Sequence, residues 1–285
     1  MQPKIGVIGG SGVYQIDGLL NPAWIIVQTP WGDPSDAILT GTLHGTAMAF
    51  LPRHGRGHVQ SPASINYRAN IDALKRLGCT DILAVSAVGS LRIDYKPGDF
   101  VLVDQYIDRT TRRETSFFGA GCVAHVSLAQ PTCARLGQAV TTAATGLTLH
   151  PAATYLAIEG PQFSTLAESR LYRSWGADVI GMTGMPEARL AREAELCYAC
   201  LAMVTDYDCW HADHGAVDVA QVIATLTANA DKARQVVANL PTQLKRPEPC
   251  PCGCDRALTQ ALLTAPAQRD PDLLAKLDAV AGRVL

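Results

Sequence analysis

The sequence has almost no net charge and no long apolar run. Its 24 Lys and Arg nearly balance its 26 Asp and Glu, which leaves a formal charge of −2 over 285 residues. This balance gives no indication of a nucleic-acid partner or of binding to an anionic membrane surface. No apolar run approaches the roughly 18 residues that a membrane span needs, and glycines interrupt the N-terminal segment before a signal-peptide core is complete. We therefore expect a cytoplasmic globular protein that binds neither nucleic acid nor membranes.

The cysteines show no obvious pairing. There are nine of them, and without an export signal we expect them to stay reduced. Cys250, Cys252 and Cys254 lie close together in a proline-rich segment and can in principle bind zinc or form a disulfide. Metal sites usually combine two separated pairs of ligands, whereas this is one tight cluster, and Cys197-x-x-Cys200 falls in a predicted helix-to-strand passage. We therefore expect plain or redox-labile thiols and no metal site.

Short apolar runs alternate with helical patterns through most of the chain. Residues 4–8, 81–85 and 201–204 have the composition of strands covered on both faces. This alternation predicts an α/β fold, a single domain at residues 1–240 with a central mixed, mostly parallel β-sheet flanked by helices. Residues 241–285 begin with several prolines and cysteines, and we expect them to form a C-terminal linker and helical tail.

Three segments show local signals. Ser61 and Pro62, with Gly78 at the exit, predict a helix over residues 61–77. Thr165 and Glu168 have the spacing of a capping box. Residues 106–118 are charged and aromatic with little periodicity, and this predicts a long loop.

Two carboxylates follow the apolar strand at residues 201–204. In open α/β sheets, ligands bind at the carboxyl ends of the strands. Asp206 and Asp208 can therefore belong to a site, or they can be surface acids on a solvated loop. Cys209 and Trp210 follow at once, which disfavours a free loop and favours the site.

Two other turns have the composition of anion-binding loops. Backbone amides of the turn at residues 9–12 can face an anion, and Ser11 adds a hydroxyl. The third glycine of a dinucleotide-binding fingerprint is missing, which disfavours a dehydrogenase; a plain tight turn is the alternative. Arg53 and His54 are followed by glycines and offer a planar fork of donors and a second donor. A solvated basic loop explains that pair equally well.

Taken together, these segments resemble one family, the trimeric purine nucleoside phosphorylases, and within it the branch that acts on 5′-methylthioadenosine. The resemblance covers about residues 4–240. The matching segments are, in order, IGVIGGSGVY, PRHGRGHVQSP, NYRANIDAL, VSAVGSL, GDFVLVDQYIDRTTRR, IEGPQFST, WGADVIGMTGMPEA and TDYDCW. So many ordered matches are more specific than any single motif, and they favour a site at each of the turns above.

The resemblance implies a role for each matching residue. The residues expected to bind phosphate are Ser11, Arg53, His54, Ser86, the backbone of Ala87, and Thr183. The residues expected around the nucleoside are Phe163, Asp206 and Asp208 at the base, Met182 at the ribose, and Val219, Val222 and Ile223 at the methylthio group. In the family, a histidine of a neighbouring subunit helps to close the 5′ end, and His125 matches it. A homotrimer with sites near its interfaces is therefore implied.

The implied reaction is phosphorolysis of S-methyl-5′-thioadenosine to adenine and 5-methylthioribose 1-phosphate, with Asp206 as the acid that protonates the purine. Phosphate is a co-substrate, and no organic cofactor or metal is expected. Phosphorylases of 6-oxopurines typically place Glu after the Phe and Asn after the Thr of these motifs. Here Ser164 and Asp206 take those places, which favours a 6-amino group. The alternatives are a 6-oxopurine nucleoside or methylthioinosine phosphorylase and a non-catalytic purine-binding protein.

Overall fold

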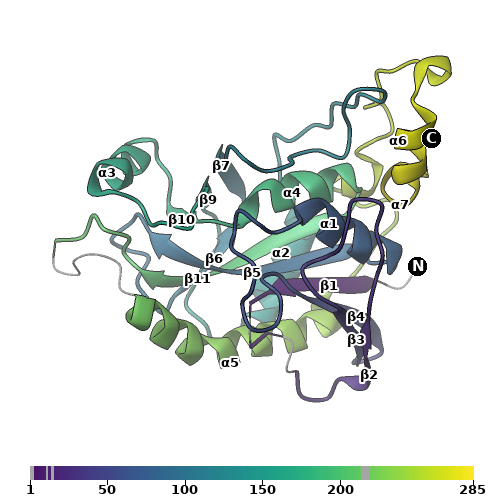
Figure 1. The fold of residues 1–285 in the computed structure, drawn as a ribbon. Coiled ribbons are helices and arrows are strands. Elements are labelled where there is room, and N and C mark those ends of the chain that lie inside the picture. The colour runs from purple at the N-terminus through teal and green to yellow at the C-terminus, as the bar shows by residue number, and fades with distance from the viewer. Residues whose placement is uncertain (1–2, 11, 14–15, 213–218) are drawn as a thin grey trace.

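An eleven-stranded sheet lies at the centre of the structure, a computed structural model that describes residues 3–10, 12–13, 16–212 and 219–285 (Figure 1). The strands are β1 (Lys4–Gly9), β2 (Leu20–Ile25), β3 (Ile38–Leu43), β4 (Thr46–Pro52), β5 (Asp81–Ser90), β6 (Phe100–Val103), β7 (Gln105–Arg109), β8 (Leu149–His150), β9 (Thr154–Ile158), β10 (Val179–Gly181) and β11 (Cys197–Asp206). The order is β2-β3-β4-β1-β5-β10-β9-β7. Off this path, β11 pairs with β5 and β6, and β8 pairs with β6.

Most neighbouring strands run in parallel. The parallel pairs are β1–β4, β1–β5, β5–β11, β9–β10, β7–β9 and β6–β8. The antiparallel pairs are β2–β3, β3–β4, β5–β10 and β6–β11. The expectation of a mixed, mostly parallel sheet in an α/β domain is confirmed.

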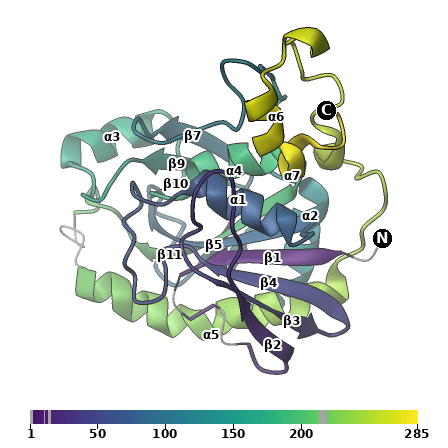
Figure 2. The same cartoon turned by 45° about the vertical axis from the view of Figure 1, so that its right-hand side comes forward.

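Helices cover both faces of this sheet. They are α1 (Tyr67–Arg76), α2 (Ala134–Ala143), α3 (Leu166–Ser174), α4 (Gly184–Glu193), α5 (Val219–Gln243), α6 (Pro271–Lys276) and α7 (Asp278–Ala281). Buried side chains of α1 and α4 share one core cluster, those of α2 and α5 share a second, and Tyr172 of α3 belongs to a smaller third. Figures 1 and 2 show α5 running beneath the sheet while α1 and α4 lie above it. Among the described helices, none has both the length and the apolarity to cross a membrane.

Strand β11 is buried on both faces, as its apolar run predicts. Tyr198 and Cys200 pack into the cluster with α1 and α4, whereas Cys197 and Leu201 pack into the cluster with α2 and α5. This division follows from the alternation of side chains along a strand. The carboxyl end of the strand, at Asp206, is only partly buried and is accessible to a ligand.

Two of the local expectations are wrong at their starts, since the helix expected over residues 61–77 begins at Tyr67 and the loop expected over residues 106–118 begins after Arg109, and the third is confirmed. Helix α1 begins after an Asn66 cap that accepts from the Ala69 amide, because residues 61–64 form a turn closed by the Ser64 amide and the Ser61 carbonyl at 3.0 Å. Residues 105–109 form the strand β7, since pairing with β9 overrides their weak periodicity. The capping box of Thr165 and Glu168 is present at the start of α3.

The segment after residue 240 packs against the two larger core clusters. Helix α5 continues to Gln243, past the boundary expected at residue 240. Leu258, Leu277 and Val280 join the cluster with α1 and α4, and Leu244 joins the other. In Figure 2 the C-terminal helices α6 and α7 lie above α1, on the side of the sheet opposite α5.

Candidate active site

A cavity of about 970 Å³ opens where the carboxyl ends of several strands meet. Its walls come from the turn after β1, the ends of β4, β5, β10 and β11, and one face of α5. Strands β1, β4, β5 and β11 are mutually parallel, so their carboxyl ends share one edge of the sheet. The arrangement places the ligand at the edge where α/β sheets usually bind one.

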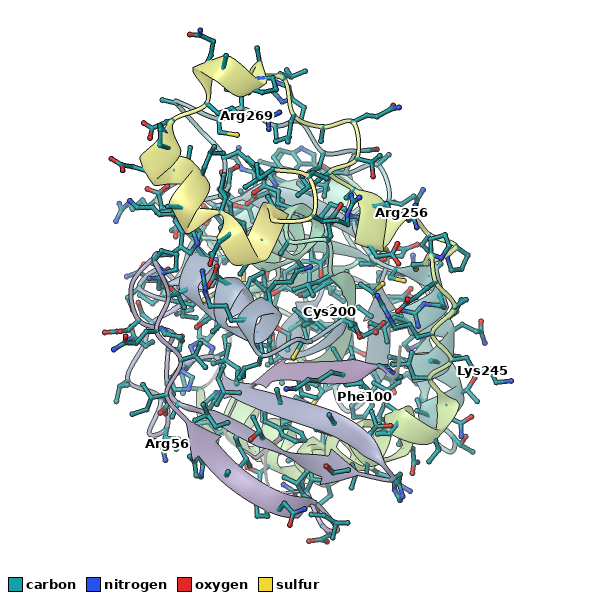
Figure 3. All side chains as sticks on the ribbon, turned by 90° about the vertical axis from the view of Figure 1, so that its right-hand side faces the viewer. Arg56, Phe100, Cys200, Lys245, Arg256 and Arg269 are labelled. Carbon is teal, nitrogen blue, oxygen red and sulfur yellow. The ribbon has the colours of Figure 1, made fainter. Side chains whose placement is uncertain are left out.

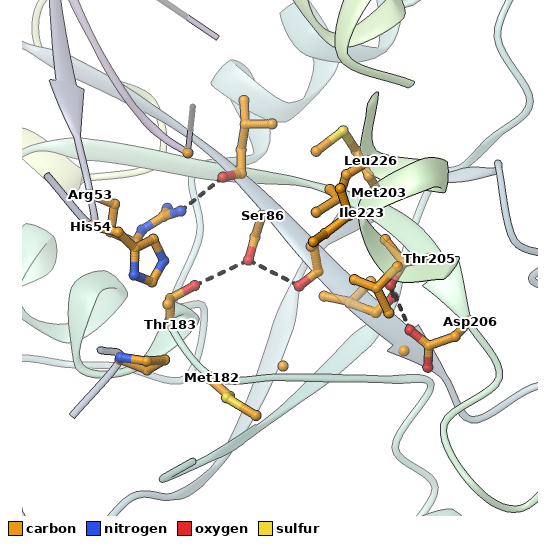
Figure 4. A pocket seen from close by; sticks show the side chains of 18 of the residues that line it. Arg53, His54, Ser86, Met182, Thr183, Met203, Thr205, Asp206, Ile223 and Leu226 are labelled. Carbon is orange, nitrogen blue, oxygen red and sulfur yellow. Dashed lines mark hydrogen bonds between the residues drawn. The ribbon is translucent and has the colours of Figure 1, made fainter. Parts of the chain in front are cut away.

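Ser86 and Thr183 form a pair of hydroxyls at one end of the cavity. Ser86 lies within β5, and Thr183 follows β10, whose antiparallel pairing with β5 returns the chain toward Ser86. Their Oγ and Oγ1 atoms are 3.1 Å apart (Figure 4). Thr183 precedes α4 without capping it through its side chain, so both hydroxyls can be directed to an anion.

Arg53 lies directly after β4 and is 2% exposed. Its Nε and Nη2 donate to the two carboxylate oxygens of Glu187 at 2.9 and 3.0 Å, Nη1 donates to the Val85 carbonyl, and Nη2 also reaches the Ile8 carbonyl. A guanidinium has five N–H donors, so these contacts leave one on Nη1 for a ligand. Burial alone lowers the pKa of Arg53, but the charge of Glu187 outweighs it and raises the pKa, which keeps the group charged.

Glu187 is a site residue that the sequence did not reveal. It is 1% exposed on α4 and also accepts from the Tyr198 hydroxyl at 2.9 Å. The fork of Arg53 is therefore held by a buried carboxylate rather than being free for a bidentate contact with an anion. No local pattern around Glu187 marks it, because its role depends on the approach of α4 to β4 and β11.

His54 is held in one tautomer. Its Nδ1 lies 2.9 Å from the Gln60 carbonyl, which can only accept, so Nδ1 carries the proton. Burial, and then the adjacent charge of Arg53, lowers the pKa of His54 to about 4. The neutral ring therefore presents an unprotonated Nε2 that can accept a hydrogen bond from a protonated oxygen of a ligand.

Asp206 lies at the opposite end of the cavity, where a bulge at residue 205 interrupts the pairing of β11 with β5. Its Oδ2 is 2.6 Å from the Thr205 hydroxyl oxygen, which also lies 3.1 Å from the Val88 carbonyl. A hydroxyl has one proton and cannot donate to both. Both contacts are satisfied when Asp206 is protonated and donates to Thr205. Burial raises the pKa of Asp206, which favours that state.

Gly89 and Asp208 fix the position of the Asp206 carboxyl group. A side chain on Gly89 would place its Cβ 2.9 Å from Asp206 Oδ1, so the glycine leaves the room that the carboxyl occupies. The Asp208 amide donates to the same oxygen at 2.7 Å. Asp208 has a φ of 51°, a left-handed conformation that Asp tolerates better than most residues. Burial raises the pKa of Asp208 to about 6.

Asp208 makes the stability of the fold depend on pH. The folded state holds this proton more tightly than the unfolded chain, whose Asp has a pKa near 3.8. Stability therefore decreases as the pH rises from about 4 to about 6, by about 3 kcal/mol. Asp208→Asn should weaken this dependence by the contribution of Asp208 in urea unfolding at a series of pH values, whereas Asp33→Asn, at an exposed position, should leave it unchanged. An unchanged dependence in Asp208→Asn would contradict the assignment.

An apolar wall joins the two polar ends of the cavity. Phe163, Met182, Val219, Val222 and Ile223 all line it. Figure 4 shows Met182 and Ile223 between the Arg53–Ser86–Thr183 end and Asp206. Ser164 also lines the cavity, and its buried hydroxyl has no hydrogen-bond partner within the described chain.

The residues after Asp208 are anchored, as the sequence indicated. Cys209 Sγ lies 3.3 Å from the Ser164 carbonyl, and Trp210 Nε1 donates to the Ser90 carbonyl at 2.8 Å. The guanidinium of Arg173 lies 3.6 Å from the Trp210 ring. The interpretation of this segment as a freely solvated loop is therefore wrong.

The cavity brings together most of the residues singled out in the sequence. They are Arg53, His54, Ser86, Ala87, Phe163, Ser164, Met182, Thr183, Asp206, Asp208, Val219, Val222 and Ile223. Ser11 lies outside the described residues, between Gly10 and Gly12 of the cavity wall. His125 is exposed and does not line the cavity of its own chain.

The chain is similar to several named proteins. An S-methyl-5′-thioadenosine phosphorylase of Cereibacter sphaeroides is 68% identical, and the alignment covers 100% of this chain and 99% of that protein. The protein of the same name from Rhodospirillum rubrum is 61% identical, with 100% and 98% covered.

Solved structures agree with these sequence matches. The crystal structure of a methylthioadenosine phosphorylase sourced from an antarctic soil metagenomic library matches with a TM-score of 0.90 and 47% identity over 98% of this chain and 99% of that one. Methylthioadenosine phosphorylase from Schistosoma mansoni in complex with adenine matches with a TM-score of 0.85 and 36% identity over 90% and 98%. Residues 4–241 match the family described as the phosphorylase superfamily. This chain belongs to the phosphorylase superfamily.

Proposed function

We propose that this chain catalyses phosphorolysis of S-methyl-5′-thioadenosine, giving adenine and 5-methylthioribose 1-phosphate, within purine and methionine salvage. The names of its relatives support this substrate. The observation that carries the proposal is one cavity with hydroxyl and guanidinium donors at one end, two carboxyl groups at the other, and an apolar wall between them.

The hydroxyl end binds phosphate. Ser86 and Thr183 donate to its oxygens, the remaining N–H of Arg53 adds a charged donor, and His54 Nε2 accepts a hydrogen bond from a protonated phosphate oxygen. The Ala87 backbone and Ser11 complete this set. Phosphate is both the nucleophile and an anion beside the cationic sugar, so its fixed position supplies much of the transition-state stabilisation.

The carboxyl end activates the leaving group. A phosphate oxygen forms the new bond to C1′ as the bond from C1′ to N9 breaks. The electron pair of the broken bond passes into the purine. The Asp206 proton, held against Thr205 before the substrate binds, passes to N7, so the base leaves neutral. Phe163 lies against the base, Met182 contacts the ribose, and Val219, Val222 and Ile223 surround the methylthio group. No organic cofactor takes part.

Ser164 and Asp206 give the site a preference for 6-aminopurines. An oxopurine presents an N1–H donor, and Ser164 offers no carboxylate to accept it. Its O6 would face the acceptor oxygen of Asp206, at a cost of about 1–3 kcal/mol for unpaired buried atoms. We expect kcat/KM for methylthioadenosine to exceed that for methylthioinosine and inosine by about 5- to 150-fold, the factor that corresponds to this cost.

A nucleoside panel assayed with and without phosphate tests both substrate and reaction. Base release from methylthioadenosine should require phosphate. Faster cleavage of methylthioinosine or inosine would favour the 6-oxopurine alternative and contradict the assignment of Ser164 and Asp206. Binding of the nucleoside without any base release would favour the non-catalytic purine-binding protein.

We further propose that the chain works as a homotrimer in the cytoplasm. His125 supports the assembly, because it is exposed and lies away from the cavity of its own chain, where a neighbouring subunit's nucleoside can use it. The nine free cysteines support a reducing compartment.

Mixing two inactive variants tests the shared site. Asp206→Ala and His125→Ala trimers should each have low activity, and mixed trimers should regain part of it, because one of their sites combines an intact Asp206 with an intact His125 from the next subunit. Subunit exchange is verified by native mass spectrometry. A fully active monomer, or no recovery after proven exchange, would rule out this arrangement.

A further inference from the structure

Four buried cysteines meet where the C-terminal segment crosses the end of the sheet. The Sγ atoms of Cys133, Cys197, Cys250 and Cys254 all lie within 4.8 Å of one another, and each residue is at most 3% exposed. Cys133 precedes α2, Cys197 begins β11, and the other two lie between Lys245 and Arg256, which are labelled on the near side of the molecule in Figure 3. We call these four residues the cysteine cluster.

The cysteine cluster corrects one premise of the sequence analysis. The cysteines at 250–254 looked like an isolated group, but the fold adds Cys133 and Cys197 from distant parts of the chain. The Gly253 amide donates to the Cys250 carbonyl at 2.8 Å, and Gly253 has a φ of 68°, so the chain turns between Cys250 and Cys254. This turn directs both thiols to the same place and leaves Cys252 outside the cluster.

The spacing and the distances suit a tetrahedral metal ion. Cys250 and Cys254 have three residues between them, within the usual spacing of two to four for a ligand pair. Cys133 and Cys197 are far apart in the sequence, and each adds one sulfur from a different element. Four sulfurs at about 2.3 Å from zinc lie about 3.8 Å from one another. The sulfurs of Cys133 and Cys250 are 3.8 Å apart, and all four lie within 4.8 Å of one another, so shifts of about 1 Å or less would bring them around a zinc ion.

Arginine side chains lie next to the sulfurs. Arg246 Nη1 is 3.8 Å from Cys197 Sγ and 3.3 Å from Asp81 Oδ2, so its guanidinium is fixed between sulfur and carboxylate. Arg135 is paired with Asp81 and also interacts with Cys197 and Cys250. Donors of this kind stabilise and orient metal-bound thiolates. A cluster that served only as apolar packing would not need them.

We propose that the cysteine cluster binds one zinc ion with a structural role. Each thiol loses its proton to solvent when its sulfur coordinates the ion, and the four sulfurs fill the tetrahedral positions, which leaves no place for a substrate. The ion ties the C-terminal segment and the start of α2 to the amino end of β11. The ten-residue β11 carries Asp206 at its other end, roughly 30 Å away.

Metal analysis of the purified full-length protein tests this proposal. We expect about one zinc per chain. Cys254→Ser and Cys133→Ser should lose most of it and unfold at a lower temperature. Cys252→Ser, in the same turn but outside the cysteine cluster, should keep the zinc and the unfolding temperature. Base release by any folded Cys254→Ser protein should stay near the unsubstituted level at a temperature well below unfolding.

A second measurement covers the case in which the serine variants fail to fold. Unsubstituted protein produced with cobalt in place of zinc should show the visible absorption bands of tetrahedral, thiolate-bound cobalt. Protein without zinc that also takes up no cobalt would overturn the proposal. Disulfides among the four cysteines, mapped by mass spectrometry without reductant, or stoichiometric iron in place of zinc would overturn it as well.

Discussion

Asp206→Asn is expected to lower kcat for methylthioadenosine by a factor of about 10² to 10⁴, the usual contribution of a positioned general acid. The amide keeps the shape of the carboxyl group and its contacts with Thr205 and the Asp208 amide, but it has no acidic proton to transfer to N7. The KM for phosphate should change little, because the phosphate donors lie at the other end of the cavity. Steady-state rates at saturating phosphate measure the effect.

A substrate that already carries positive charge on the purine provides the control. When a nucleoside is methylated at N7, its purine base leaves without taking up a proton. The Asp206→Asn protein should therefore cleave this nucleoside nearly as fast as the unsubstituted protein does. Asp33→Asn, at an exposed position, should leave both reactions unchanged. If Asp206→Asn slows both substrates equally, the carboxyl group positions the base and does not act as the acid.

Arg53→Ala is expected to lower the free energy of unfolding by about 3–5 kcal/mol, because it leaves the buried Glu187 without its partner. Both side chains are almost fully buried, at 3% and 1% exposure. The KM for phosphate should also rise, and by more than the KM for the nucleoside. Urea unfolding and initial rates below the unfolding transition measure the two effects separately.

The double variant Arg53→Met, Glu187→Gln separates the two roles of Arg53. Removing both charges should recover much of the lost stability, since no uncompensated charge stays buried. The raised KM for phosphate should persist if the remaining N–H of Arg53 contacts phosphate. A double variant with the unsubstituted KM for phosphate would show that Arg53 acts only in the fold.

The sequence predicted the sheet and the strand ends well because their signals are local. The apolar run at residues 201–204 and the polar residues after it lie in one stretch of chain, and burial on both faces of β11 follows from that composition. The capping box at Thr165 is equally local. The start of α1 was missed because Asn66 and Ser61 are both good caps, and the choice depends on the turn at residues 61–64.

The sequence did not predict contacts made by distant segments. Glu187 meets Arg53 across 134 positions, and Cys133 meets Cys250 across 117. Nothing near Glu187 or Cys133 in the chain marks either pair, since each depends on how helices and the C-terminal segment pack on the sheet. The fork of Arg53 was expected to face phosphate, and only the packed α4 reveals its contact with Glu187.

The identity of the sugar product tests the proposed reaction most directly. Methylthioadenosine is incubated with the protein and inorganic phosphate in water enriched in oxygen-18, and the products are analysed by mass spectrometry. We predict adenine and 5-methylthioribose 1-phosphate without label in the sugar, and no base release when phosphate is omitted. Free 5-methylthioribose carrying oxygen-18, formed with or without phosphate, would contradict the account, because it would make the protein a hydrolase.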